Sequence, residues 1–478
     1  MTHQKTLYWY DYEAFGLNPM TSRLAQFAGI RTDEDLNIIG EPLMMYCKPA
    51  DDFLPDPNSC LITGITPQKA LAEGLPEVEF IGRINEEFSR PNTCVLGYNN
   101  LRFDDEYTRY TLYRNLFDPY AREWQNGCSR WDLLDVVRLT RTLRPEGINW
   151  PTTKEDRPTV RLEDLSVANN IAHEAAHDAL SDVYATIALA RLIKEKQPKL
   201  YDFAYQHRSK TKLLKMLNLR EQKPVIHISG MYPLEKGNMA VVVPVAMHPT
   251  NKNGIIVYDL SEDPQDLLNL SPAKIHERLF TRKEELPEGV KRIPLKTVHV
   301  NRCPVIVPFM TLDAKTAKRY QIDFNVCRAH LEELKQQPGL AKKIQKVFSE
   351  TEFEPRTDPD EMLYSGPFFS NEDKQKMAQL HQLSPQALAD FQPHFDDPRL
   401  PEMLFRLRAR NYPDTLNEEE RQRWQAFRKE RLTKATKERF NLANYFDEIE
   451  RLRADPQRSG KDWRVLDELE AYGKEIMP

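Results

Sequence analysis

Five polar residues at the ends of predicted secondary-structure elements constrain most strongly what this chain can fold into. Asp11 and Glu13 directly follow Leu7–Tyr10, an aromatic and apolar run that predicts a β-strand. Residues i and i+2 of a strand point to the same face, so these two carboxylates are expected to point together. Asp104 follows a second predicted strand, Thr93–Tyr98, where a helix is expected to begin. The pattern therefore predicts a cluster of acids at strand ends.

The other two residues of this set, His177 and Asp182, flank the start of a predicted helix. Apolar residues at helical spacing predict this helix from about residue 179 to 193, and Asp178 is able to cap it. His177 is then expected just outside the helix and Asp182 within its first turns.

Clustered carboxylates next to a histidine are typical of a site for hard divalent cations such as Mg²⁺ or Mn²⁺. We expect Asp11 to bridge two ions, Glu13 and Asp182 to complete the first, and Asp104 to hold the second directly or through water. His177 is expected to deprotonate an attacking water, because the unperturbed histidine pKa lies near neutrality. Since 72 of the 478 residues are acidic, the prediction rests on the combination and not on any single acid.

The same set of residues is similar to the DnaQ-like exonuclease superfamily, in its histidine branch. In the tyrosine branch the base lies four residues before the final Asp, a position that is Asp178 here. Further family marks are Ile62–Thr66, which resembles the loop that packs against the terminal nucleotide, and Asp132–Leu134, which resembles the helix after the second motif. Ala14 departs from the threonine of many members. The resemblance implies an α/β fold with an RNase H-like mixed sheet.

Longer stretches resemble the bacterial exodeoxyribonuclease I family along essentially the whole chain. They are Gly97–Glu106, Ser129–Asp135, Leu143–Pro151 and Arg406–Pro413. This resemblance implies a processive hydrolase that degrades single-stranded DNA from the 3′ end to 5′-mononucleotides, with two Mg²⁺ ions for which Mn²⁺ can substitute, in DNA repair and recombination. A monomer is implied as well.

Composition limits the classes of protein to which the chain can belong. The mean hydropathy is −0.64, and no stretch approaches the roughly 20 apolar residues that a membrane helix needs. No signal-peptide pattern is visible, so a cytoplasmic location is expected. Six scattered cysteines without a Cys-x-x-Cys pair are typical of reduced thiols. The net charge of −5 means that any path for DNA must be a local basic track.

The distribution of strand-like and helix-like segments along the sequence predicts three domains. Residues 1–197 alternate strand-like and helix-like segments, as the DnaQ-like exonuclease domain should. Residues 198–350 contain short β-branched runs separated by turns and predict an SH3-like β-barrel domain with helical insertions. An acidic, Pro-containing linker is expected at 351–361, and charged periodic helices predict an all-α C-terminal domain over 356–478. We expect the second and third domains to close a groove around the strand, which would make digestion processive.

Basic and aromatic residues interleave where a DNA strand would need them. Aromatic faces stack on bases without regard to sequence, and guanidinium groups pair with phosphates. Any one of these side chains is equally well explained as a core residue or a solvated helix face. The predicted substrate-binding residues are Glu13, Arg109, Tyr120, Trp124, Arg138 and, by its matching family position near the substrate phosphate, Arg161.

The resemblance also implies a protein partner, the acidic C-terminal tail of bacterial single-stranded-DNA-binding protein. A basic run between Arg208 and Lys223 is typical of a solvated helix face, and it could also receive such a tail. Arg144 and Lys223 are the candidate partner-binding residues.

Two other functions remain open from the sequence. The first is a 3′→5′ exoribonuclease of the same superfamily, which would leave the three hundred residues after the nuclease domain unexplained. The second is a non-catalytic single-stranded-DNA-binding scaffold, which the presence of all five active-site residues disfavours.

Overall fold

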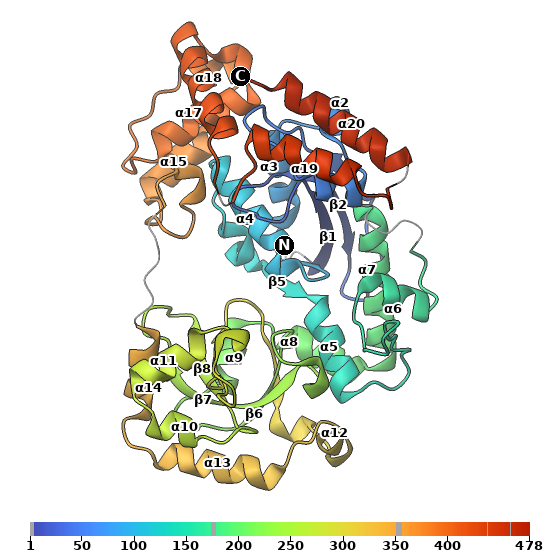
Figure 1. Cartoon of the computed structure of the whole chain (residues 1–478), viewed down its shortest axis with the longest axis vertical. Coiled ribbons are helices and arrows are strands. Elements are labelled where there is room, and N and C mark those ends of the chain that lie inside the picture. The colour runs from blue at the N-terminus through green and yellow to red at the C-terminus, as the bar shows by residue number, and fades with distance from the viewer. Residues whose placement is uncertain (1–3, 174–177, 350–355, 437, 459) are drawn as a thin grey trace. The chain divides into compact units, whose positions relative to one another are not determined.

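The computed structural model describes residues 4–173, 178–349, 356–436, 438–458 and 460–478. The chain forms two compact units. The first contains Met1–Ser129, His173–Ile187 and Pro355–Pro478, and the second contains Arg130–Ala172 and Ala188–Glu354. The first unit thus combines the blue N-terminal and the red C-terminal parts of the chain (Figure 1).

A mixed five-stranded sheet begins the chain, with strand order β3-β2-β1-β4-β5. β1 pairs antiparallel with β2, β2 pairs antiparallel with β3, and β1 pairs parallel with β4. The first three strands therefore form an antiparallel meander. The strands are β1 (Thr6–Ala14), β2 (Leu24–Thr32), β3 (Leu43–Tyr46), β4 (Thr93–Gly97) and β5 (Ser129–Asp132).

β1 continues past the aromatic run and carries Asp11 and Glu13 within it. Tyr10 and Tyr12 pack into the core on one face of the sheet, with ring centroids 6.3 and 5.4 Å from that of Phe27. Such aromatic pairs contribute about 0.5–1.5 kcal/mol beyond area burial. Because neighbouring residues of a strand alternate in direction, Asp11 and Glu13 leave β1 on the opposite face.

Gly97 allows the end of β4 to approach β1 closely. A Cβ atom at this position would lie 2.5 Å from the carbonyl oxygen of Tyr10, the residue before Asp11. A single turn of 3₁₀ helix, Asn100–Arg102, follows, and the helix α4 begins at Asp104. A side chain at residue 97 would force this strand end, and the acid that follows it, away from β1.

Helices cover the sheet of the first unit. α1 and α2 each carry a proline in the first turn, and the side chains of Asp56 and Thr66 cap them. α3 buries Phe80, Ile81 and Ile84 in the same core as the tyrosines of β1. These helices are α1 (Pro57–Thr63), α2 (Pro67–Glu73), α3 (Glu77–Phe88), α4 (Asp104–Arg114) and the first part of α7 (Ala179–Lys196).

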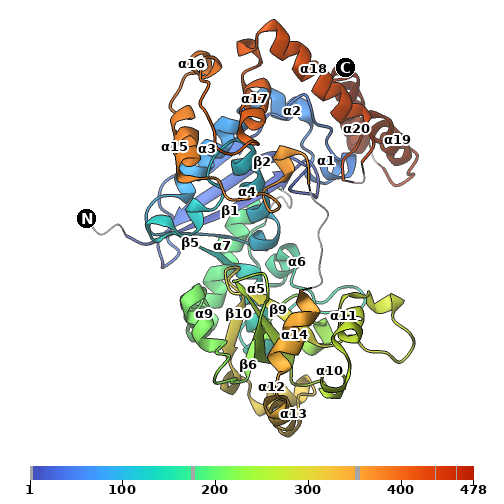
Figure 2. The same cartoon turned by 90° about the vertical axis from the view of Figure 1, so that its left-hand side faces the viewer.

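The C-terminal segment is helical, as predicted, and it shares its core with the N-terminal part of the chain. α17 packs against α3, and α20 packs against α1 and α2 (Figure 2). The helices are α15 (Asn371–Leu380), α16 (Pro385–Ala389), α17 (Leu400–Asn411), α18 (Glu418–Thr433), α19 (Leu442–Arg453) and α20 (Gly460–Glu475).

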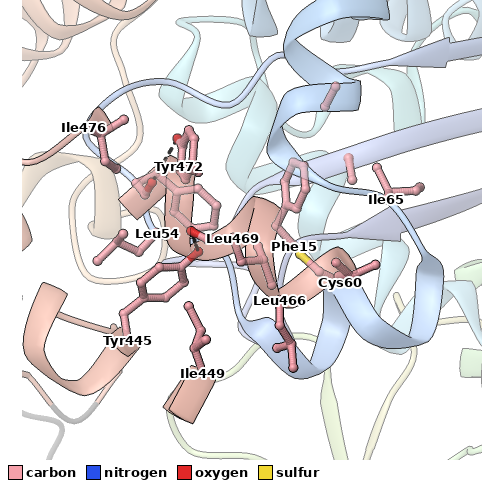
Figure 3. Close-up of a cluster of buried hydrophobic side chains, with 14 of the residues drawn as sticks. Phe15, Leu54, Cys60, Ile65, Tyr445, Ile449, Leu466, Leu469, Tyr472 and Ile476 are labelled. Atoms are coloured by element: carbon pink, nitrogen blue, oxygen red, sulfur yellow. Dashed lines mark hydrogen bonds between the residues drawn. The ribbon is translucent and has the colours of Figure 1, made fainter. Parts of the chain in front are cut away.

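One buried cluster joins α19 and α20 to the region around α1 (Figure 3). Phe15 and Leu54 from the N-terminal part pack there with Ile449 and Leu466. The hydroxyl of Tyr445 donates to the carbonyl of Leu469 at 2.8 Å, which satisfies the polar end of a fully buried ring. The segment that follows β1 is therefore held by the last two helices of the chain.

A buried ion network fixes the chain where it enters the C-terminal segment. Arg406 contacts the carboxylates of both Asp358 and Asp360, at 2.5 and 3.1 Å. Arg410 binds Asp360 at 2.7 Å, and Arg431 binds Asp358 at 3.2 Å. The C-terminal end of the stretch that its composition predicts as a linker is thus anchored to α17 and α18, while residues 351–355 lie outside the described part.

The second unit is built on an antiparallel sheet of order β10-β6-β7-β8-β9. The short β-branched runs predicted in this region form four of these strands, and β10 lies beyond them. The strands are β6 (Val225–Ile228), β7 (Met239–Met247), β8 (Gly254–Asp259), β9 (Leu295–His299) and β10 (Val305–Pro308). The inserted helices are α9 (Lys210–Met216), α10 (Gln265–Asn269), α11 (Pro272–Phe280), α12 (Ala314–Arg319), α13 (Phe324–Gln336) and α14 (Leu340–Phe348).

α5 (Leu133–Leu143) belongs to this second unit although its sequence lies within the predicted nuclease segment. The hydroxyl of Thr142 donates to the carbonyl of Gly237 at 2.6 Å, and Arg141 donates to the side chain of Asn238 at 3.1 Å. These contacts dock α5 beside β6 and β10. α6 (Leu162–Ala168), α8 (Pro198–Gln206) and the end of α7 complete the unit.

Among the described residues, no helix is both long enough and apolar enough to cross a membrane.

Candidate active site

Three of the predicted carboxylates meet in the first unit. Asp11 and Glu13 come from β1 and Asp182 comes from the first turn of α7. Each offers a ligand oxygen, and these oxygens lie within 4.8 Å of one another. This acidic trio (Asp11, Glu13 and Asp182) brings together residues that are about 170 positions apart in the sequence.

Burial and the charges of neighbouring acids raise the pKa values of Asp11 and Glu13. Burial, followed by the charges of Asp104, Glu13 and Asp182, raises the pKa of Asp11 well above its usual range. Burial, together with the charges of Asp182 and Asp104, raises the pKa of Glu13 to about 8. A divalent cation among these oxygens would offset both the repulsion and the lost hydration. The donor set therefore fits a hard divalent metal ion.

Asp104 lies near the trio but is not part of it. It is the first residue of α4 and is buried, and its charge contributes to the raised pKa values of both Asp11 and Glu13. The backbone carbonyl of Asp104 accepts a hydrogen bond from the hydroxyl of Thr108. The same hydroxyl lies 3.1 Å from the hydroxyl of Tyr12 in β1, so these contacts tie Asp104 to β1. This placement suits the predicted second metal position.

Asp178 sets the start of α7 as the sequence predicts. The amide of Ser181 donates to the Asp178 side chain at 3.1 Å, and the amide of Asp182 donates to the Asp178 carbonyl at 3.0 Å. This cap fixes where Asp182 leaves the helix. His177, the predicted base, lies outside the described residues.

The structure places a different histidine on the acidic trio. Nε2 of His173 lies 2.5 Å from Oδ1 of Asp182, and only 5% of the His173 side chain is exposed. His173 is not among the residues predicted from the sequence. The available signal was that two histidines, His173 and His177, precede the same aspartate.

The predicted DNA-contacting residues of the first unit fall into two kinds. Arg109 is buried, and its guanidinium binds Glu123 at 2.7 Å and Glu106 at 2.8 Å. Trp124, in contrast, has 67% of its surface exposed. Tyr120 combines both kinds of environment. Its ring lies under the guanidinium of Arg109 and packs against the ring of Phe368.

The remaining predicted residues belong to the second unit. Arg161 immediately precedes α6, and its side chain is 73% exposed, 3.9 Å from Glu163. Arg138 is paired with Asp135 at 2.6 Å. The two candidate partner-binding residues are also paired, Arg144 with Asp313 at 3.3 Å and Lys223 with Glu221 at 2.7 Å.

Family models match three consecutive parts of the chain. A model described as "Exonuclease" matches residues 8–190, "Exonuclease I SH3-like domain" matches 208–350, and "Exonuclease I C-terminal domain" matches 357–476. The chain belongs to the exonuclease I family. The fold predicted from the sequence, a DnaQ-like exonuclease domain followed by SH3-like and helical domains, is confirmed, and the protein is a hydrolytic nuclease.

Relatives in the exonuclease I family match along nearly their whole length. Exodeoxyribonuclease I of Haemophilus influenzae is 48% identical over 440 residues, which are 92% of this chain and 93% of that protein. The structure of a moderately thermophilic exonuclease I from Methylocaldum szegediense is 52% identical with a TM-score of 0.95, covering 99% of this chain and 100% of that one.

A third relative carries both a metal and DNA. The zinc-bound form of the E. coli exonuclease I complex with single-stranded DNA is 45% identical to this chain, with a TM-score of 0.94, and covers 99% of this chain and 100% of its own. Family membership and the acidic trio together make a divalent metal the cofactor of this nuclease.

Proposed function

We propose that this chain is a processive 3′→5′ exonuclease that hydrolyses single-stranded DNA to 5′-mononucleotides and acts in DNA repair and recombination. The observation that carries the proposal is the acidic trio, in which oxygens of Asp11, Glu13 and Asp182 converge within 4.8 Å. The choice of substrate rests on a relative of 45% identity whose structure contains single-stranded DNA.

We assign the metals as two Mg²⁺ ions, with Mn²⁺ able to replace them. When bound, such a pair stabilises the attacking and leaving oxygens of a phosphodiester. Asp11 would be shared by the two ions, Glu13 and Asp182 would help to hold the first, and Asp104 would hold the second, directly or through water. Glu13 also contacts the substrate, and His177 accepts the proton of the attacking water.

Exposed aromatic rings of the first unit support a single-stranded substrate. Phe368 is 81% exposed and Trp124 is 67% exposed, and the ring centroid of Tyr120 lies 5.8 Å from that of Phe368. Exposure of large aromatic rings to water is unfavourable. Unpaired bases can cover such rings by stacking on them, which contributes about 1–3 kcal/mol per base. These rings accept bases of any sequence, as a general exonuclease requires.

Basic residues supply the contacts to phosphate in this proposal. Arg161 is the freest to reach one, since 73% of its side chain is exposed and its acidic neighbour is 3.9 Å away. Arg138, paired with Asp135, and Arg109 are assigned to the same path, and Arg109 would have to exchange its buried pairs with Glu123 and Glu106 to reach a phosphate.

The same proposal includes the domain boundaries 1–197, 198–350 and 356–478. The ranges that the family models match, 8–190, 208–350 and 357–476, support these boundaries. The closed groove is part of the proposal as well. We assign the acidic tail of single-stranded-DNA-binding protein as a partner, received at Arg144 and Lys223 by a monomer. All six cysteines are described as thiols and not as disulfides, which fits the reducing cytoplasm.

Release of nucleotides from end-labelled strands tests the function. With Mg²⁺, the wild type should release the 3′ label of single-stranded DNA promptly, and Asp182→Ala should not. Glu195→Ala is the matched control, because Glu195 is an exposed acid on the same helix. Prompt loss of the 5′ label, or equal activity of Asp182→Ala, would contradict the polarity or the site.

The same assay separates the two other functions. Comparable release from a matched RNA strand would favour an exoribonuclease. A scaffold would bind DNA with or without a chelator and release nothing, whereas the proposed enzyme loses release and keeps binding when the metal is removed.

A further inference from the structure

We propose that His173 is a positioning residue that orients Asp182 for the divalent cation. This inference rests on the proposed function, because it assigns a role within the same metal site. Its basis is the contact between Nε2 of His173 and Oδ1 of Asp182 at 2.5 Å.

Both partners of this contact are shielded from water. The side chain of His173 is 5% exposed and that of Asp182 is 19% exposed. An ionised carboxylate only accepts hydrogen bonds, so Nε2 of His173 carries the proton and donates it. A buried donor that holds one carboxylate oxygen restricts rotation of the Asp182 side chain.

Asp182 needs such a restraint because its neighbours repel it. Its ligand oxygen lies within 4.8 Å of those of Asp11 and Glu13, so like charges on the three acids oppose their convergence when no cation is bound. Without His173, the Asp182 side chain would turn toward water and the trio would be lost between binding events. Hydrogen-bond partners of ligating carboxylates generally contribute 10–100-fold to metal affinity.

The contact of His173 with Asp182 also indicates that His173 and His177 have different roles. Nε2 of His173 donates to Asp182 and is therefore not a proton acceptor for water at that atom. We accordingly assign His173 to holding the metal site and leave the role of base to His177. The two roles predict different kinetic defects.

Binding of Mn²⁺ to the full-length protein without DNA, followed by titration calorimetry, tests the assignment directly. His173→Ala should weaken Mn²⁺ binding by about 10–100-fold. His173→Gln should recover most of the affinity, because its amide nitrogen occupies the position of Nε2. His173→Asn should not recover it, because its amide nitrogen matches Nδ1 and falls short of Asp182.

A histidine elsewhere in the same unit gives the matched control. His394 is exposed, so His394→Ala should bind Mn²⁺ like the wild type. Thermal melts of each variant show whether folding is retained, and the comparison of Gln with Asn keeps the proposal falsifiable if the alanine variant unfolds. Unchanged or tighter Mn²⁺ binding by His173→Ala, or equal binding by the Gln and Asn variants, would overturn the proposal.

Kinetics distinguish positioning from catalysis. His173→Ala should shift the Mg²⁺ concentration for half-maximal rate by the same 10–100-fold and regain nearly the wild-type kcat at saturating Mg²⁺. A loss of kcat that saturating metal does not repair would mean that His173 is itself the base and would overturn the assignment. If Mn²⁺ binding responds as expected but no strand is cleaved, the positioning role stands and the proposed function fails.

Discussion

Arg410 of α17 donates to Asp52, with 2.9 Å between Nη2 and Oδ2, although the two residues are 358 positions apart in the sequence. Neither side chain is more than 2% exposed. Asp52 lies between β3 and α1, so this pair fastens α17 to the segment that leads into α1. It also extends the ion network around Asp360, which the same arginine binds.

Arg410→Met should destabilise the protein by about 3–5 kcal/mol, because it leaves two buried carboxylates without their shared partner. Urea unfolding at pH 7 measures this loss. Arg421→Met is the matched control, since Arg421 is 55% exposed and lies 3.8 Å from its own partner, and it should change stability by less than about 1 kcal/mol. Equal effects of the two changes would refute the idea that the buried pair holds these segments together.

Trp124→Ala and Phe368→Ala should each weaken the binding of a single strand by about 1–3 kcal/mol, the usual value of one stacked base. Fluorescence anisotropy of a labelled oligonucleotide, in chelator to prevent cleavage, measures the affinity. Trp463→Ala provides the control, because Trp463 is an exposed ring on α20, 52% accessible and outside the Tyr120–Phe368 pair. A similar loss in the control would mean that exposed rings bind DNA without forming a path.

His381 should lower the free energy of unfolding as the pH becomes acidic. Burial lowers the pKa of His381 to about 4, while the unfolded chain protonates near 6.5. The unfolded state therefore binds more protons between these values, and stability falls as the pH drops from 6.5 toward 4, by about 2–3 kcal/mol from this group.

His381→Gln should remove that part of the pH dependence, because glutamine does not titrate and its amide can still donate to the carbonyl of Leu116, as the histidine ring does. Urea unfolding at pH 7, 5 and 4 compares the two proteins. The exposed His394, changed in the same way, should leave the slope unaltered. Parallel curves for the wild type and His381→Gln would show that another group causes the loss.

A chain cut before residue 356 should fail to fold a stable nuclease domain. The cut uncovers Phe15, Leu54 and Ile65, which α19 and α20 bury, and burial of such side chains is worth about 1.5–3 kcal/mol each. A second cluster that contains Tyr113 is uncovered as well, and the combined loss is comparable to the 5–15 kcal/mol by which domains are usually stable. Solubility and far-UV circular dichroism of the fragment test this, and a soluble, active fragment would contradict it.

The sequence predicted the local elements that carry the metal site, and for clear physical reasons. Alternation along β1 places Asp11 and Glu13 on one face whatever surrounds the strand, and the cap at Asp178 sets the start of α7. These features depend on neighbours within a few residues, so they can be derived without knowing the rest of the fold.

What the sequence did not reveal depends on contacts between distant segments. Asp358 and Asp360 have the composition of a solvated linker, and only the arginines of α17 and α18, supplied from far along the chain, turn them into a buried anchor. β10 escaped prediction because its short apolar run ends in a proline, which weakens the strand signal. His173 escaped because nothing in the residues around it indicates a contact with Asp182, nine positions further along the chain.

The discontinuity of the first unit also bears on how the protein is made. Residues of β1 leave the ribosome first, but Phe15 and its neighbours are covered only by α19 and α20, which are synthesised hundreds of residues later. At typical rates of about 5–20 residues per second, the N-terminal sheet waits tens of seconds for its covering. During that interval the apolar side chains around Phe15 are exposed on the nascent chain, and a product of interrupted translation that ends before α19 never buries them.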